Sequence, residues 1–198
     1  MRRRRASSSH CYALSMDDLA VRASTCVKCP LSLTRHHVVV GSGPRIPSLV
    51  LLGEAPGKNE DEVGEPFIGR SGQLLFTLVQ EETGLLREQC YVTSVVKCRP
   101  PNNRTPRAGE LSACRPWWEE QLALLEPAII VTLGNTSTRE ILRTKATIGE
   151  LRGKVQPLGP SRVVPTYHPA AALRGGPNVV SAMREDLRVV KSLLDEVT

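Results

Sequence analysis

Apolar runs bounded by turn residues alternate along this chain with longer stretches in which apolar side chains recur at helical spacing. The short runs are typical of buried strands, and the spaced pattern is typical of helices that bury one face. These patterns predict strands at 48–53, within 90–98, at 128–134 and at 162–169, and helices at 16–24, 71–84, 107–127, 135–143 and 179–197. Pro116 interrupts the third of these helices, and Asn135 or Thr136 is expected to cap the fourth.

The alternation of strands and helices defines the fold class. Strands that are separated by helices form a mostly parallel sheet with helices on both faces. We therefore expect a three-layer α/β/α fold around a central, mostly parallel sheet of about four strands. No internal repeat or second domain is evident, so we expect a basic, disordered tail at 1–14 and a single domain at 15–198.

Composition and charge narrow the choice of partner. The chain has 198 residues, of which 40% are hydrophobic, and its 26 Lys and Arg against 20 Asp and Glu give a net charge of +6. A basic balance favours a polyanionic partner such as nucleic acid. No apolar run has the ~20 residues of a membrane span, so no membrane partner is expected. The start "MRRRRASSSH" lacks the apolar stretch of a secretory signal. It could be a transit peptide, but we interpret it as a basic tail with weak, salt-sensitive affinity for DNA.

Four of the six cysteines are spaced as two pairs. Cys26 and Cys29 form a C-x-x-C motif, and Cys98 and Cys114 lie further along the chain. Without a secretion signal a disulfide framework is not expected. Two separated pairs of thiolates predict a site for a metal or a cluster, and their spacing leaves zinc and a [4Fe-4S] cluster equally open. Cys11 and Cys90 lack a partner at such spacing, so we interpret both as ordinary free thiols.

The four predicted strands are followed by polar segments rich in Gly and Pro. These segments are "GEAPG", "KCRPPNNR", "GNTS" and "HPAAAL". Ligands of open α/β sheets bind outside the carboxyl ends of the strands, so the four segments are expected to converge on one site. The first of them is not a phosphate loop, because three residues rather than four separate Gly53 from Gly57 and Asn59 follows Lys58.

Together these motifs carry a resemblance to a known family. "CVKCPL", "GEAPGKNEDEVGEPFIGRSGQLL", "VVKCRPPNNRTP" and "YHPAAALR" resemble the motifs of family-4 uracil-DNA glycosylases, the iron-sulfur branch of that superfamily. The similarity runs from about Cys26 to Leu193. It implies that Cys26, Cys29, Cys98 and Cys114 hold a [4Fe-4S] cluster, whereas the spacing alone leaves zinc as the alternative. It also implies a DNA substrate, double- or single-stranded, that contains uracil or another deaminated base.

The resemblance assigns roles in a pocket for a flipped base. Phe67 matches the aromatic residue that stacks on the base, and Gly53 and Gly57 would let the main chain approach base and sugar. Glu54 and Glu60 match positions near the target nucleotide and the attacking water. His168 matches the histidine that stabilises negative charge on the departing base.

Residues after the last strand and on two earlier segments are expected to contact DNA. Leu173 in "AAALR", expected to be a loop, would fill the space that the extruded base leaves, and Arg174 would contact phosphate. Arg70 and Arg104 are further phosphate candidates, as are Arg99 and Lys97 with weaker support.

Two positions depart from the family pattern. Family-4 members usually carry Asn just before V-V-K-C, where this chain has Ser94, whose single hydroxyl cannot reproduce the donor and acceptor of an amide. Ala55 stands where the related family-1 enzymes have an Asp that positions water. The handling of water therefore falls to Glu60 or to Asn103, with Glu54 as a further candidate, and base preference could shift towards hypoxanthine or xanthine.

The resulting hypothesis is a monofunctional DNA glycosylase that flips a deaminated base, most simply uracil, and hydrolyses its N-glycosidic bond. Two alternatives stay open: the same enzyme with the shifted preference that Ser94 suggests, and a non-catalytic nucleic-acid-binding module with a structural four-cysteine zinc site. We expect a monomer in the cytoplasm of a prokaryote-like cell, associated with the nucleoid.

Overall fold

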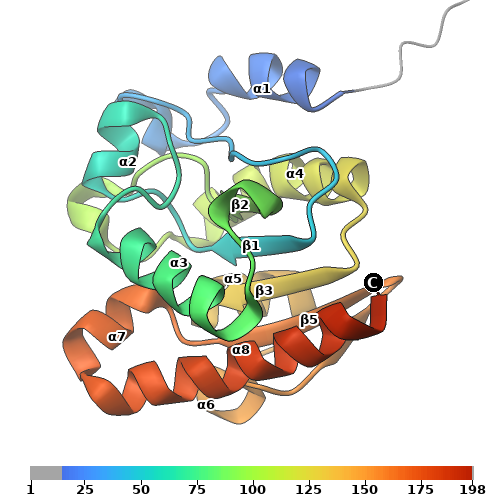
Figure 1. Ribbon diagram of the computed structural model, residues 1–198. Helices are drawn as coiled ribbons and strands as arrows, with labels where there is room; N and C mark the ends of the chain where they lie inside the picture. The colour runs from blue at the N-terminus through green and yellow to red at the C-terminus, as the bar shows by residue number, and fades with distance from the viewer. Residues whose placement is uncertain (1–14, 198) are drawn as a thin grey trace, which may run out of the picture.

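The computed structural model describes residues 15–197, so the predicted basic tail at 1–14, with Cys11, lies outside the described residues. A five-stranded sheet forms the centre, with strand order β2-β1-β3-β5-β4 (Figure 1). Its strands are β1 (Leu49–Gly53), β2 (Cys90–Ser94), β3 (Ile129–Leu133), β4 (Gln156–Leu158) and β5 (Ser161–Thr166). β2, β1, β3 and β5 run parallel, which confirms the predicted α/β class.

The prediction of about four strands missed β4. This three-residue strand pairs antiparallel with β5 at the edge of the sheet and is only partly buried. It contains Pro157, which an edge strand tolerates because one side of its backbone needs no ladder partner. Because β4 has only three residues and one of them is a proline, its sequence lacks the apolar run from which the other strands were predicted.

All five predicted helices are present: α1 (Met16–Ser24), α3 (Arg70–Thr83), α4 (Ala108–Leu125), α5 (Asn135–Leu142) and α8 (Pro177–Val197). α4 continues through Pro116. The predicted cap of α5 is wrong, since Gly134 is its N-cap residue and neither Asn135 nor Thr136 caps it with a side chain. The sequence did not predict the helices α2 (Lys58–Val63), α6 (Ile148–Leu151) and α7 (Pro169–Gly175), or the 3-10 turns η1 (Pro30–Leu33), η2 (Arg87–Gln89) and η3 (Pro101–Asn103).

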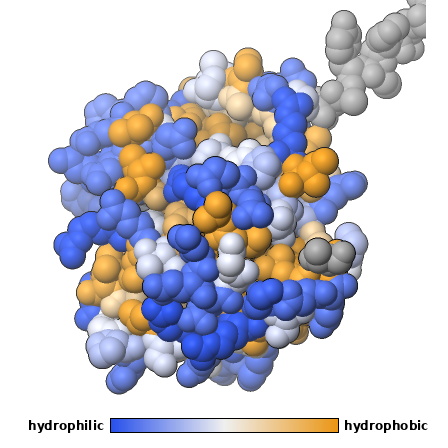
Figure 2. All heavy atoms as spheres, in the orientation of Figure 1, coloured by the Kyte–Doolittle hydropathy of each residue, from blue (hydrophilic) through white to orange (hydrophobic). Residues whose placement is uncertain are grey.

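Alternate side chains of the buried strands supply two separate cores. Leu49 and Leu51 of β1 pack with α3, α7 and α8 on one face of the sheet. Val50 and Leu52 pack with α4 and α5 on the other face, which gives the expected three layers (Figure 1). Each such side chain contributes about 1.5–3 kcal/mol when it is fully buried. The outer side of α8 is largely hydrophilic (Figure 2), as one-sided burial requires, and no helix among residues 15–197 has the length and apolarity to cross a membrane.

The strand order places a switch point at the centre of the sheet. The connection from β1 leads outward to β2 on one side, and the chain then returns past β1 to form β3 on the other side. Loops that leave β1 and β3 therefore diverge at their carboxyl ends, which opens a crevice there. This is the edge of the sheet on which the four polar segments lie.

A substitution of Gly72, in the first turn of α3, would test how closely this helix packs against the loop that carries Phe67. A Cβ atom at Gly72 would lie 1.8 Å from the carbonyl oxygen of Phe67. Although Gly→Ala usually stabilises a helix, Gly72→Ala is expected to destabilise the fold by about 1–3 kcal/mol, because backbone would have to move. Urea denaturation measures the change.

Gly109→Ala in the first turn of α4 is the matched control, because a Cβ at Gly109 meets nothing within 4 Å. It is expected to stabilise the protein by up to about 1 kcal/mol. Equal effects of the two substitutions would contradict the close approach of Gly72 to Phe67.

Candidate functional site

A cavity of about 620 Å3 opens at the carboxyl edge of the sheet. All four polar segments singled out in the sequence contribute to its wall, together with the loop that precedes α3. Its lining includes Glu54, Ala55, Gly57, Glu60, Phe67, Ser94, Asn103, Arg104, Gly134, Thr136, His168 and Arg174. The fold thus brings together residues from across the chain, as the strand-end argument expects.

Phe67 forms one wall of the cavity with an unusual backbone. Its φ angle is +54°, a left-handed conformation that a bulky side chain rarely adopts. The ring packs directly over Gly53 at the end of β1, where a Cβ atom would lie 2.6 Å from the ring atom Cζ. It also lies beside the imidazole of His168, with 6.1 Å between ring centroids. Gly53 is therefore needed at the strand end because the aromatic ring occupies the space of a side chain.

His168 lies two residues beyond β5 and is the N-cap residue of α7. The backbone N–H of Ala170 donates a hydrogen bond of 3.1 Å to His168 Nδ1. Because Nδ1 acts as an acceptor, the proton of the neutral ring resides on Nε2. The ring can therefore offer an N–H donor to a group in the cavity.

The surroundings of His168 favour this neutral form. Burial and, to a smaller extent, the nearby Arg174 cation lower the pKa of His168 to about 4, whereas the Glu60 carboxylate acts in the opposite direction. The imidazole thus stays neutral at physiological pH and donates from Nε2.

Two carboxylates line the same cavity. The Glu60 side chain, 9% exposed, accepts a hydrogen bond of 3.0 Å at Oε1 from the backbone N–H of Gly69. Its Oε2 atom lies close to Gly57, where a Cβ atom would be 2.7 Å away. The carboxylate of Glu54 accepts a hydrogen bond from the hydroxyl of Thr136. Both carboxylates are thus held by donors from other segments.

Ala55, Ser94 and Asn103, which the sequence also predicts for this site, line the cavity, whereas Gly53 lies behind the Phe67 ring and is not among the lining residues. Ser94, at the end of β2, is paired in register with Gly53, and its hydroxyl oxygen would lie 3.2 Å from a Cβ at Gly53. Asn103 lies at the rim, where its Oδ1 accepts a hydrogen bond of 2.6 Å from Arg99 Nε. Ala55 contributes no polar side-chain group. The Ser94 hydroxyl and the Phe67 ring therefore both lie against Gly53 at the end of β1.

Cations surround the cavity unevenly. Among residues 15–197, neither Arg70 nor Arg174 forms an ion pair, and both are exposed. Arg104 lines the cavity, but Glu110 holds its guanidinium through bonds of 2.9 and 2.6 Å. Elsewhere most arginines of the described residues are paired with carboxylates, namely Arg22, Arg45, Arg115, Arg143, Arg152, Arg162, Arg184 and Arg188. Arg174 lines the cavity, and Arg70 directly precedes Ser71, which also lines it, so both unpaired cations belong to segments of the cavity wall.

The expectation that Lys97 contacts phosphate is wrong. Its side chain is 1% exposed and lies inside the protein. The ammonium group donates hydrogen bonds of 2.6 Å to Thr93 Oγ1 and 2.8 Å to the carbonyl oxygen of Ser94, and a further bond to Gln121. Lys97 cannot reach a phosphate because it lies in a buried segment after β2. The pattern of charges in the sequence does not reveal this burial. The predicted loop around Leu173 is also corrected, because Leu173 lies on α7 with its side chain 45% exposed.

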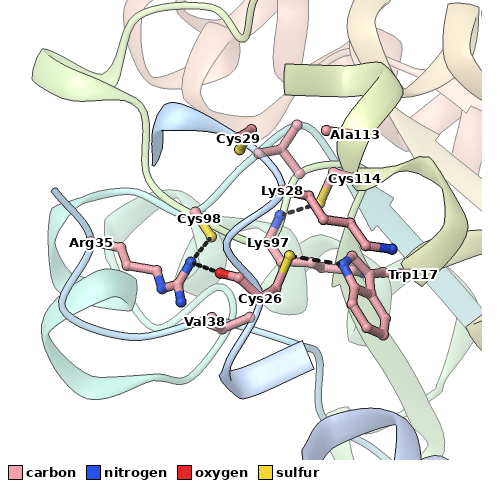
Figure 3. Close-up of a pocket in the computed structure, with 11 residues that line it drawn as sticks. Cys26, Lys28, Cys29, Arg35, Val38, Lys97, Cys98, Ala113, Cys114 and Trp117 are labelled. Atoms are coloured by element: carbon pink, nitrogen blue, oxygen red, sulfur yellow. Dashed lines mark hydrogen bonds between the residues drawn. The ribbon is translucent and has the colours of Figure 1, made fainter. Parts of the chain in front are cut away.

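The four paired cysteines meet at a second, smaller cavity under α1. Cys26, Cys29, Cys98 and Cys114 all line it, with Cys98 and Cys114 buried (Figure 3). Cys90 lies elsewhere, fully buried in the core beside α3, where burial raises its thiol pKa to about 12. The structure therefore separates the four cysteines from Cys90, as the spacing predicts.

Hydrogen-bond donors approach three of the four sulfur atoms. The Lys97 backbone N–H lies 3.2 Å from Cys114 Sγ, Trp117 Nε1 lies 3.4 Å from Cys26 Sγ, and Arg35 NH1 lies 3.5 Å from Cys98 Sγ (Figure 3). Donors of this kind suit thiolates rather than thiols, so the donor set fits a group held by four Cys thiolates. As the side chains stand, no group of three or more His, Cys, Asp or Glu within 15–197 is arranged to hold a metal ion.

Sequence reasoning missed Thr136 and Asn135 as site residues. The segment "GNTS" was identified as a strand end, but its side chains were assigned only to helix capping. Both line the cavity, and the Asn135 amide oxygen accepts a hydrogen bond of 2.7 Å from the backbone N–H of Ile148. Their position directly after a predicted strand, at the edge where ligands of parallel sheets bind, is the signal that could have identified them.

Comparison of this sequence with known proteins identifies a matching family and several relatives. The model of the uracil DNA glycosylase superfamily matches residues 40–188. The type-4 uracil-DNA glycosylase of Sulfurisphaera tokodaii is 40% identical over 187 residues, which cover 90% of this chain and 84% of the relative. Those of Saccharolobus solfataricus (41% identical, 91% of this chain and 87% of the relative) and Thermotoga maritima (41%, 90% and 94%) are similar to the same extent.

The surroundings of His168 predict its titration. We expect a pKa of about 4 in the folded protein, measured from the imidazole proton signals by NMR. Arg174→Gln should raise this pKa because it removes a cation, and Glu60→Gln should lower it because it removes an anion. Because the folded pKa lies below the unfolded value of about 6.5, the stability that His168 confers above that pH is lost as the pH falls towards 4. A wild-type titration near 6.5, or shifts of the opposite signs, would contradict the described environment.

Proposed function

Because the chain belongs to the type-4 uracil-DNA glycosylase family of the uracil-DNA glycosylase superfamily, we propose that the cavity at the carboxyl edge of its sheet receives a uracil flipped out of DNA. The enzyme then hydrolyses the N-glycosidic bond and leaves an abasic site. The observation that carries this assignment is that Glu60 and Phe67, which follow β1, line one cavity with His168, which follows β5 much later in the chain.

The cavity has the size and the lining for one base and its sugar. Its volume of about 620 Å3 lies within the range of ~300–1,000 Å3 for small-ligand sites. Flipping a nucleotide costs a few kcal/mol of lost stacking and pairing. Stacking on an aromatic ring such as Phe67 returns roughly 1–3 kcal/mol, so this ring offsets much of that cost.

His168 stabilises the departing base in this proposal. As the bond between N1 and C1′ breaks, the electron pair moves into the base, and negative charge grows on its oxygens. A neutral Nε2–H donor meets that charge without changing its own protonation state. The interaction is stronger in the transition state than with bound uracil, so it accelerates the bond cleavage.

A carboxylate and a water molecule complete the reaction. The sugar gains positive charge as the base leaves, and Glu60 or Glu54 is placed to stabilise it and to orient water. The water oxygen forms the new bond to C1′, and the proton that this water loses ends on N1 of the departed uracil anion, which completes the hydrolysis. No lysine lines the cavity among residues 15–197, which supports a monofunctional hydrolase without a Schiff-base step.

The unpaired cations and an exposed apolar side chain support DNA binding at the cavity mouth. Arg174 and Arg70 can contact phosphates, and Leu173 on α7 can fill the gap left by the flipped base. We propose that the protein works as a monomer and that it acts on DNA in the nucleoid of the cytoplasm.

We further propose that Cys26, Cys29, Cys98 and Cys114 hold a [4Fe-4S] cluster. The donors of Arg35, Trp117 and the Lys97 backbone would stabilise the thiolates. When bound, the cluster would supply a rigid cross-link between the segment before β1 and the segments after β2 and in α4. The loop from Cys98 leads directly to Asn103 and Arg104 at the cavity, so this cross-link would fix part of the cavity wall.

The glycosylase assignment is tested with oligonucleotides that carry one uracil, hypoxanthine or xanthine, as duplexes and as single strands, followed by alkaline cleavage of abasic sites. Wild-type protein is expected to release uracil. His168→Ala should slow single-turnover release by about 10²–10³-fold, the usual loss for one removed donor to a developing anion. Phe67→Ala should slow it by roughly 5–150-fold, which corresponds to the lost stacking.

Arg162→Ala is the control, because Arg162 pairs with Glu196 and lies near the amino end of β5, whereas the cavity opens at the carboxyl ends of the strands; its rate should equal that of the wild type. Release of a purine but not of uracil would establish the shifted preference instead, and Ser94→Asn should then restore uracil release. Failure to release any of the three bases would overturn the glycosylase assignment.

The cluster assignment predicts a brown protein with broad visible absorption that contains about four iron and four sulfide per chain. Cys98→Ser and Cys114→Ser should lose most of the iron. Cys90→Ser should keep it, because the Cys90 thiol lies in the core formed with α3, α7 and α8. A colourless protein with one zinc ion per chain would contradict the cluster assignment and would show that the four cysteines form a structural zinc site.

A further inference from the structure

Phe67 is held in its left-handed conformation by contacts from elsewhere in the chain. A residue with a Cβ atom prefers a negative φ, and a change of φ would turn the Cα–Cβ bond and redirect the ring. The ring direction at the cavity wall therefore depends on what fixes the Phe67 backbone. Gly72 contributes only space, since its missing side chain lets the Phe67 carbonyl approach α3.

Arg87 makes the direct contacts with this backbone. Its NH2 group lies 2.8 Å from the carbonyl oxygen of Pro66, and its NH1 group lies 3.3 Å from the carbonyl oxygen of Phe67. The guanidinium thus donates to two successive carbonyls with its fixed fork, a geometry that a lysine cannot reproduce.

The guanidinium of Arg87 is itself well anchored. It lies over the ring of Phe76 on α3, 4.5 Å from the ring centroid, and Arg87 begins the short turn η2 that leads into β2. No carboxylate pairs with Arg87 in the described part of the chain. Both its planar face and its donors are therefore directed to α3 and to the loop that carries Phe67.

We propose that Arg87 is a positioning residue for base excision, which holds the Pro66–Phe67 backbone so that the Phe67 ring lines the cavity. The inference rests on the proposed function, because it assigns Arg87 to the stacking step of that reaction. Arg87 does not line the cavity and acts on the flipped base only through Phe67.

A double-mutant cycle tests this role with uracil-containing duplex under single-turnover conditions. Arg87→Met keeps the length of the side chain and removes its donors. It is expected to slow uracil release by about 10-fold or more in the wild-type background, since a shift of about 1 Å in a positioning group can cost 10²-fold. In the Phe67→Ala background the same substitution should slow release less than 2-fold. Arg87→Lys, which keeps the charge and one donor group, should fall between Arg87→Met and wild type.

Arg184→Met is the matched control. Arg184 is also a partly buried arginine that contacts α3, but it pairs with Glu81 and Glu82 away from the cavity. It is expected to lower the urea midpoint without changing the rate of uracil release. If Arg87→Met does not fold, the same cycle with Arg87→Lys decides, because the loss should again disappear with Phe67→Ala.

The outcomes separate this inference from the proposed function. Absence of uracil release by the wild type would overturn the function itself. Two results would overturn only the role of Arg87 while the wild type still releases uracil. In the first, the Arg87 variants release uracil as fast as the wild type. In the second, the Arg87 substitutions slow release equally whether residue 67 is Phe or Ala.

Discussion

The parallel alignment of four strands is the constraint on which the rest of this structure depends. Parallel strands end at the same edge of the sheet, so the segments after β1, β2, β3 and β5 must meet there. The reversal of strand order between β1 and β3 keeps the loops apart and leaves room for a ligand. Residues separated by more than 100 positions, such as Glu60 and His168, thereby act on one small volume. The hydrophobic cores on the two faces of the sheet supply the stability that holds this edge in place.

Backbone hydrogen bonds fix the groups that line the cavity. His168 accepts a hydrogen bond from the backbone N–H of Ala170, and Glu60 accepts one from the backbone N–H of Gly69. The backbone carbonyl of Phe67 accepts one from the Arg87 guanidinium. Groups held in this way need little reorganisation when charge develops, which is how a polar site outperforms water. The left-handed backbone of Phe67 costs about 1–3 kcal/mol, and the core offsets this strain. A strained residue at the cavity wall, held by several contacts, is typical of a functional site.

The segment from Ser94 to Cys98 links the cavity with the cysteine site. Ser94 lines the cavity, and its carbonyl accepts a hydrogen bond from the Lys97 ammonium. The backbone N–H of Lys97 approaches the sulfur of Cys114. Through this buried lysine the two sites share one rigid element, so an occupant of the cysteine site would stabilise the wall of the base cavity. The two cavities are therefore connected by the hydrogen bonds of one buried residue.

The sequence by itself determined the fold class, the main helices and strands and the meeting of the strand ends, because these follow from periodic burial and from the geometry of parallel sheets. It also singled out the four cysteines that line one cavity, because they occur as two pairs, one of them a C-x-x-C motif, and the remaining cysteines lack such spacing. Only the tertiary structure decided that Lys97 is buried, that Thr136 binds Glu54 and that Arg87 holds Phe67. β4 and α7 also emerged only there, because they are short and gain their stability from neighbours rather than from their own pattern. Contacts between residues distant in sequence depend on how the layers pack, and no local pattern records that packing.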